Sequence, residues 1–187
     1  EKPSHPNQVV GKIQLAGIKE AELAVTAAKE TFTTWSKTSE EERAVYLEKL
    51  AGVIKRDRYD LMALEVFESG KTWSEADGDI TEAIDFCLYY ARDIRNLAKP
   101  RRVGHVPGEL SLYHYQPRGV ALVIAPWNFP LAILTGMVGA AFVTGNTVVM
   151  KQSELSPLTT DFLGRLSIEA GVPPGVFNIV HGFGSTT

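Results

Sequence analysis

The C-terminal part of the chain, from Gly119 onward, alternates short apolar runs with longer segments of helical character. The runs predicted to be strands are residues 120–125, 146–150 and 176–180, and the segments predicted to be helices are 130–144 and 157–170. The first run is apolar throughout, which is typical of a strand buried on both faces. A β-α-β-α-β order builds a parallel, Rossmann-like sheet with a mononucleotide site, so the expected fold class is α/β.

The preceding part of the chain, residues 17–98, is predicted to be helical. Its first apolar stripe recurs at helical spacing and consists of Ala24, Ala27, Ala28, Thr31, Phe32 and Trp35. Ser39 and Glu42 form a capping-box signature for a second helix, and Gly70 suits the left-handed end of a third. A fourth helix is predicted to bury one face, made by Ile80, Ala83, Ile84, Cys87, Leu88, Ala91 and Ile94.

Two further segments lack a helical pattern. Residues 11–18 are expected to form an early strand or a connection. Residues 101–117 alternate around Pro107 and Gly108, a pair that favours a type II turn, so a protruding β-hairpin is predicted there. Both faces of this hairpin are similarly polar, and such an arm needs a partner surface.

Composition limits the classes of function. The 187 residues carry a net charge of −3, which gives no attraction for phosphate backbones and argues against a nucleic-acid partner. No run approaches the ~20 apolar residues of a membrane span, and the first residues do not resemble a signal peptide, so a cytoplasmic protein is expected. The single cysteine, Cys87, excludes an internal disulfide, and the four histidines show no ligand spacing, so no metal site is expected.

Polar residues follow each of the three predicted strands, in the segments 126–130, 151–154 and 182–185. Because ligands of open α/β sheets bind at the carboxyl ends of strands, these segments are candidates for one site. Lys151 and Glu154 have the spacing to bracket the two hydroxyls of a ribose. The segment GFGSTT (182–187) has only the first two glycines of a dinucleotide fingerprint, which is a weak signal alone.

Three motifs in combination resemble the aldehyde dehydrogenase superfamily: GVALVIAPWNFP (119–130), GNTVVMK (145–151) and EAGVPPGVFNIV (169–180). The resemblance covers essentially the whole chain. EAIDF (82–86) followed by YYA (89–91) is similar to one branch, the L-glutamate γ-semialdehyde (1-pyrroline-5-carboxylate) dehydrogenases of proline catabolism. The resemblance implies an NAD(P)-dependent oxidoreductase that converts this semialdehyde to glutamate. Another aliphatic or succinate-type semialdehyde is the alternative substrate.

The resemblance also implies roles for single residues. Asn128 matches the asparagine that donates to the oxygen of the aldehyde as negative charge develops. Lys151 and Glu154 match the pair that holds the adenosine ribose of NAD, and Glu154 favours NAD over NADP. Other positions matching the cofactor site are Ile124, Ala125, Pro126, Trp127, Ser153 and Gly184. Glu82 and Phe129 match substrate-contacting positions of the semialdehyde branch. Gln152 stands where family enzymes often have proline.

Simpler interpretations exist for each of these residues. Asn128 alone is more often a turn residue or a helix cap, and Lys151 with Glu154 is more often a solvated charge pair. Glu82 is an ordinary exposed helix residue in that view, and Phe129 a packing residue. Cys87 lies on an apolar helix stripe, which is typical of a buried structural thiol.

The nucleophilic cysteine and the water-activating glutamate of such enzymes have no counterpart here. The resemblance therefore implies that residues 1–187 are the N-terminal part of an NAD-binding domain, without the catalytic domain and inactive alone. Its parts are the helical segment 17–98, the hairpin 101–117, expected to mediate homo-oligomer contacts, and the nucleotide-binding unit 119–187. The alternative of another class is a truncated, non-catalytic module for folding or oligomer contacts.

Overall fold

In the computed structural model, which describes residues 1–185 and 187, four helices come first along the chain. They are α1 (Ile18–Trp35), α2 (Glu40–Arg56), α3 (Arg58–Ser69) and α4 (Trp73–Leu97). Ser39 caps α2 as predicted, because its Oγ accepts a hydrogen bond from the Glu42 backbone N–H over 3.2 Å. Gly70 ends α3 with φ of 72°, the left-handed conformation that glycine adopts without steric cost.

The remaining elements form two sheets and two helices. They are β1 (Arg101–Arg102), β2 (Leu112–Tyr113), β3 (Val120–Ala125), α5 (Ala132–Val143), β4 (Thr147–Gln152), α6 (Pro157–Glu169) and β5 (Phe177–Val180). The strands β3, β4 and β5 lie side by side in that order, and both pairs are parallel. The β-α-β-α-β order predicted from residue 119 onward is therefore the order observed.

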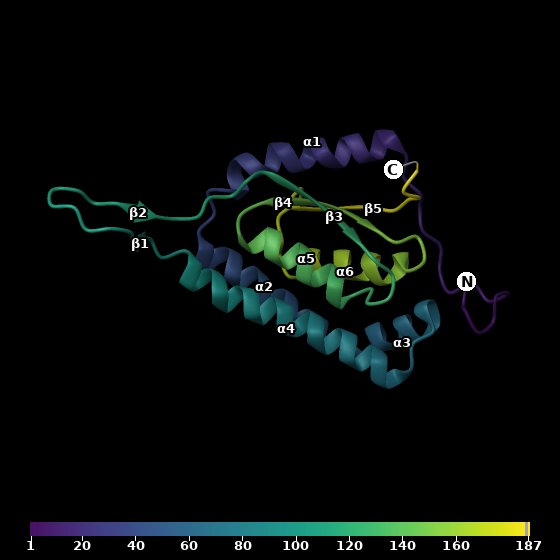
Figure 1. Ribbon diagram of the computed structural model, residues 1–187. Coiled ribbons are helices and arrows are strands. Elements are labelled where there is room, and N and C mark those ends of the chain that lie inside the picture. Colours follow the sequence, from purple (N-terminus) through teal and green to yellow (C-terminus); the bar gives the residue numbers. More distant parts are fainter. Residues whose placement is uncertain (186) are drawn as a thin grey trace.

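Helices cover both faces of the parallel sheet. Figure 1 shows α1 along one face and α5 with α6 along the other, while α2 and α4 lie beyond α5. One large apolar core fills the space between α2, α4, α5 and the sheet. Among its fully buried side chains are Leu47, Ile80, Leu134 and Met150. A smaller cluster of Ala28, Val149 and Val180 joins α1 to the opposite face.

The strands β1 and β2 pair antiparallel, and the segment that carries them extends away from the rest of the chain (Figure 1). Its turn has Gly108 at φ of 84°, and the Glu109 backbone N–H donates to the Val106 carbonyl over 3.1 Å. These are features of a type II turn. Apolar side chains of this segment are exposed, among them Val106, Leu110 and Leu112.

The prediction that β3 is buried on both faces is wrong for one face. Leu122 and Ile124 are 66% and 62% exposed. The parallel register places Leu122 beside Val149, on the face that α1 covers. The helix packs on Val120, at the start of the strand, but leaves the carboxyl end of the strand uncovered. β3 is also at the edge of the sheet among the described residues.

A smaller correction concerns α4, and two further predictions hold in part. Leu88 is 46% exposed and does not belong to the buried face of α4. In the stripe of α1, Ala28 and Trp35 are buried and the other four residues are partly buried. Residues 11–18 form a connection that runs into α1, and no strand is found there in the described chain.

Candidate functional site

The carboxyl ends of β3, β4 and β5 lie side by side, and the residues predicted to bind the cofactor lie at these ends or directly after them. Trp127 and Asn128 follow β3, Glu154 follows β4, and Gly184 follows β5. Ile124 pairs with Lys151 across β3 and β4, and Ala125 pairs with Gln152. The topology therefore brings the segments 126–130, 153–156 and 181–185 to the same end of the sheet, where open α/β sheets bind ligands.

Lys151 and Glu154 form an ion pair at this edge. The Nζ atom of Lys151 lies 3.1 Å from Oε2 of Glu154. Lys151 belongs to β4 rather than to the segment after it, so the strand fixes its backbone. The pKa of Glu154 is below its ordinary value, because its own backbone N–H and then Lys151 stabilise the carboxylate. The pair thus presents a cation and an ionised acceptor side by side.

Apolar side chains flank this ion pair on the uncovered end of β3. Ile124 and Trp127 are 62% and 53% exposed, and Pro126 is exposed beside them, whereas Ala125 points into the core. Exposed apolar surface beside a charged pair suits a ring system that carries polar substituents. The hydroxyl of Ser153 accepts a hydrogen bond from the Leu155 backbone N–H over 3.3 Å and shapes the turn after β4.

The two glycines after β5 differ in their surroundings. A Cβ atom on Gly182 would overlap Thr187 Oγ1 and lie 3.2 Å from the Ala16 carbonyl oxygen, so a larger residue there would have to displace these neighbours. A Cβ on Gly184 would meet no described atom within 4 Å, so this glycine lies open. Thr186 of the segment GFGSTT lies outside the described residues.

Asn128 lies in a pocket of ≈ 560 Å³ together with Phe129 and Glu82, which come from the segment after β3 and from α4. These were the three predicted catalytic and substrate-contacting positions, and the fold brings them together. The side-chain amide of Asn128 is exposed and has no hydrogen-bond partner within the described chain, so its N–H groups are free to donate to a ligand. Glu75 adds a second exposed carboxylate to the pocket.

A cluster of charged side chains, two of which line this pocket, was not predicted from the sequence. Lys71 Nζ lies 2.8 Å from Oδ2 of Asp79 and 3.3 Å from Oε2 of Glu65, and both carboxyl side chains are fully buried. Lys71 also lies over the Phe129 ring, with Nζ 4.7 Å from its centroid. Burial, followed by the charge of Asp79, raises the pKa of Glu65 to about 9, so Glu65 is neutral at pH 7.

Gln152 links the segment after β3 to the segment after β4, and the sequence did not predict this link. Its side chain is 1% exposed, and Nε2 donates to the Pro126 carbonyl over 3.0 Å and to Ser156 Oγ over 2.8 Å. The end of β4 is thereby tied to the segment that carries Asn128. The hydrophobic pattern of the sequence does not indicate that the Gln152 side chain is buried or that it bonds to both segments.

Other candidate features carry no ligand chemistry. Cys87 is buried in α4, and burial raises the pKa of its thiol to about 12. The described residues contain no group of three metal-ligating side chains. In the part of the chain that the structure describes, none of the helices has the length and apolar character to cross a membrane.

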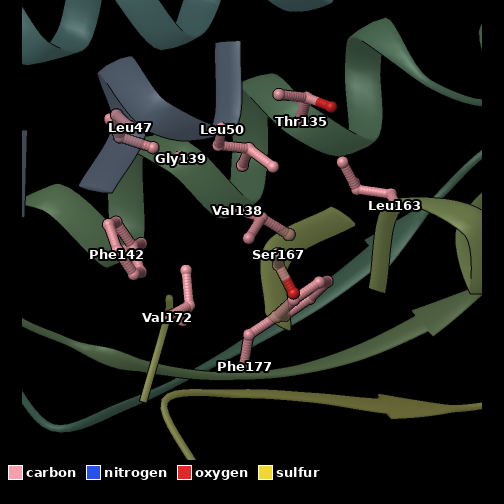
Figure 2. Close-up of a pocket in the computed structure, with 10 residues that line it drawn as sticks. All are labelled: Leu47, Leu50, Thr135, Val138, Gly139, Phe142, Leu163, Ser167, Val172 and Phe177. Atoms are coloured by element: carbon pink, nitrogen blue, oxygen red, sulfur yellow. The ribbon is translucent and has the colours of Figure 1, made fainter. Parts of the chain in front are cut away.

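Figure 2 shows a cavity inside the core, lined by side chains of α2, α5 and α6 with Val172 and Phe177. Its volume is only ≈ 20 Å³, about enough for a single water. The lining is apolar except for Thr135 and Ser167. This cavity is a packing defect and not a binding site.

Comparison with known proteins adds to this geometry. The aldehyde dehydrogenase family profile matches residues 1–187, the full length of the sequence. The chain belongs to the aldehyde dehydrogenase family. A 1-pyrroline-5-carboxylate dehydrogenase of Bacillus pumilus is 47% identical over 184 residues, which cover 98% of this chain and 36% of that protein. The chain thus spans about a third of the length of the curated relatives it matches.

Solved structures of this dehydrogenase family share the fold. Proline utilization A (PutA) from Bdellovibrio bacteriovorus aligns with a TM-score of 0.97 and 55% identity, over 99% of this chain and 19% of that chain. A 1-pyrroline-5-carboxylate dehydrogenase from Thermus with bound NAD aligns with a TM-score of 0.96 and 42% identity, over 99% of this chain and 36% of that chain. The arrangement of helices around the parallel sheet is therefore the arrangement of the family.

Proposed function

We propose that the chain is the N-terminal, cofactor-binding part of a 1-pyrroline-5-carboxylate dehydrogenase, which oxidises L-glutamate γ-semialdehyde to glutamate. The names of the relatives support this assignment, and so does the NAD bound to the Thermus enzyme. The observation that carries the proposal is the juxtaposition at one sheet edge of the Lys151–Glu154 pair and the open Asn128 amide. The full-length protein used in the experiments is this sequence continued to the length of its relatives.

The residues at the sheet edge fit a nicotinamide dinucleotide. Lys151 donates to a ribose hydroxyl, and the ionised Glu154 accepts from the other. Ile124, Pro126 and Trp127 offer apolar surface beside this pair, and the open Gly184 leaves room for close approach. When bound, the dinucleotide supplies the acceptor for the hydride. A 2′-phosphate would be repelled by Glu154, so we propose NAD rather than NADP as the cofactor.

Asn128 is the proposed oxyanion donor. Its free amide N–H groups donate to the aldehyde oxygen as negative charge develops there, and a single such donor contributes ~3 kcal/mol to the barrier reduction. The same pocket holds the exposed carboxylates of Glu75 and Glu82, which favour the ammonium group of an amino-acid aldehyde. Phe129 forms its apolar wall. A succinate-type semialdehyde has no ammonium group to engage these carboxylates.

The hairpin of residues 101–117 is the proposed homo-oligomer contact. It extends away from the rest of the chain (Figure 1), and its exposed Val106, Leu110 and Leu112 would be covered by a second subunit. Deleting the hairpin from the full-length protein should lower the molar mass measured by light scattering. An unchanged mass would remove this role from the hairpin.

Steady-state assays with the full-length protein test the proposed reaction. NADH formation is followed with L-glutamate γ-semialdehyde and, at equal concentration, with succinate semialdehyde. We expect the amino-acid aldehyde to have the higher kcat/KM, and Glu82→Gln to reduce this preference. A reversed preference would favour the succinate-type substrate. No turnover with either aldehyde, together with no NAD binding by calorimetry, would favour a non-catalytic module.

A further inference from the structure

Two buried carboxylates accept hydrogen bonds from the first turns of α5 and α6. These helices follow the segments 126–130 and 153–156. Asp79, in α4, accepts hydrogen bonds from the backbone N–H groups of Ala132 at 2.8 Å and Leu131 at 3.3 Å, at the start of α5. Glu68, at the end of α3, accepts from the N–H groups of Leu158 at 2.6 Å and Thr159 at 2.9 Å, at the start of α6.

Neither helix supplies its own cap. The residues at the N-cap positions of α5 and α6, Leu131 and Ser156, make no side-chain capping bond, and neither first turn contains an acidic residue. The first backbone N–H groups of a helix have no partner within the helix, and a carboxylate near them is favoured by the helix dipole. The caps come instead from α3 and α4, far away in the sequence.

Each cap lies next to residues of the proposed site. Asn128 precedes Leu131 by three residues, so the Asp79 cap fixes the end of the segment that carries the amide. Glu154 precedes Leu158 by four residues, so the Glu68 cap fixes the end of the segment that carries the ribose acceptor. Lys71 adds a second link to the first segment, because it binds Asp79 and lies over Phe129.

Both caps are rigid by burial. Asp79 is fully buried and Glu68 is 7% exposed. Glu68 also accepts a hydrogen bond from Thr159 Oγ1 over 2.7 Å, which fixes the direction of its carboxylate. A buried carboxylate with several donors holds its partners in one geometry, and removal of its charge leaves those donors with a weaker partner.

We propose that Asp79 and Glu68 are separate positioning residues, Asp79 for the oxyanion donor Asn128 and Glu68 for the ribose-binding pair Lys151 and Glu154. The inference rests on the proposed function, since it assigns each carboxylate to one part of that site. It predicts that the two near-isosteric changes Asp79→Asn and Glu68→Gln affect different kinetic constants. Residues that served only for stability would affect both constants together.

The test is steady-state kinetics of the full-length protein with NAD and L-glutamate γ-semialdehyde. Asp79→Asn should lower kcat roughly 10- to 100-fold and leave the KM for NAD within about twofold, because a small displacement of a reacting group costs rate. Glu68→Gln should raise the KM for NAD about tenfold and leave kcat within about threefold. Each variant is the matched control of the other. The opposite pattern, or equal changes in both constants, would overturn the proposal.

Double variants separate this inference from the proposed function. If Asn128→Ala alone leaves kcat unchanged, the proposed role of Asn128 fails. If Asn128→Ala lowers kcat, the proposal requires that Asp79→Asn cause less than about a twofold further loss in that background. A full additional loss would overturn the positioning role and leave that of Asn128 intact. Glu68→Gln is tested in the same way in the Lys151→Ala background, with the KM for NAD as the measured constant.

Milder variants serve if the first ones do not fold. Lys71→Met removes one partner of Asp79 and the contact with Phe129 but keeps both backbone hydrogen bonds. It should lower kcat without changing the KM for NAD. Thr159→Val removes only the hydroxyl that binds Glu68 and should raise the KM for NAD without changing kcat. A raised KM for NAD in Lys71→Met, or a lowered kcat in Thr159→Val, would contradict the proposal.

Discussion

The side chain of Gln152 donates a hydrogen bond to the carbonyl oxygen of Pro126 over 3.0 Å, and this bond joins the end of β4 to the segment after β3. The same nitrogen lies 2.8 Å from Ser156 Oγ, just before α6. The segment after β3 and the segment between β4 and α6 are thus linked through one buried amide. Adjacent parallel strands alone would leave these segments free to move relative to one another.

Gln152→Ala is expected to lower the free energy of unfolding by about 1–3 kcal/mol, because it removes two hydrogen bonds and opens a small cavity. Chemical denaturation of the full-length protein measures this change. Ser153→Ala is the matched control at the neighbouring position, where the hydroxyl accepts only from Leu155, and it should have little effect. Equal stabilities of the two variants would show that the link between the loops contributes nothing.

Gly139 lines the small cavity inside the core, and an added methyl group fits there. A Cβ on Gly139 would lie 3.5 Å from Tyr90 and 3.8 Å from Leu47, which is ordinary van der Waals contact. Gly139→Ala should therefore stabilise the protein by up to about 1 kcal/mol, mainly through helix propensity. Gly136→Ala, one turn earlier, should not, because its Cβ would lie 3.1–3.2 Å from the Phe86 ring. Differential scanning calorimetry distinguishes them, and a higher Tm for Gly136→Ala would contradict the packing described.

Glu65 makes stability depend on pH. Its pKa is about 9 in the folded chain because of burial and the nearby charge of Asp79, against an ordinary value of 4.5. The stability that comes from this raised pKa is fully present below pH 4.5 and is lost as pH rises toward 9. The loss is at most about 1.4 kcal/mol per pH unit for one proton.

Glu65→Gln should remove this dependence. Between pH 5 and 9 the variant is expected to gain stability relative to the wild type as pH increases, in thermal unfolding of the full-length protein. Glu22→Gln alters an exposed carboxyl group of α1 and is the control, which should follow the wild-type curve. Parallel curves for Glu65→Gln and the wild type would show that Glu65 is ionised in the folded chain.

Cys87 should be inert in the native protein. Its thiol is fully buried and has a pKa of about 12, so the reactive thiolate is scarce at pH 8. Iodoacetamide followed by peptide mass spectrometry should find Cys87 unmodified in the native state and modified in urea. Rapid native labelling would mean that α4 opens or that the thiol has another environment.

The pattern of the sequence was enough for the order of the elements, because each helix and strand carries its own periodicity and end signals. Ser39 and Gly70 mark helix ends through local chemistry, and both act as predicted. The burial of β3 was not predictable in the same way. An apolar run shows that a strand can be buried, whereas the exposure of Leu122 and Ile124 depends on where α1 lies.

The residues of the candidate site also fall into two groups, those that the sequence indicates and those that only the tertiary structure reveals. Asn128, Lys151 and Glu154 belong to contiguous motifs at strand ends, so the sequence was sufficient to single them out. Asp79 and Glu68 act on backbone groups 52 and more residues away, through contacts that only tertiary packing creates. In the sequence they are single acidic residues in amphipathic helices, where exposed carboxylates are expected.

A crystal structure of the full-length protein with NAD, and without aldehyde, would show where the dinucleotide binds. We predict that the two hydroxyls of the adenosine ribose lie within hydrogen-bond distance of Lys151 Nζ and the Glu154 carboxylate, with the Asn128 amide facing the nicotinamide end of the dinucleotide. A dinucleotide bound away from the carboxyl ends of β3, β4 and β5 would contradict the proposed cofactor site.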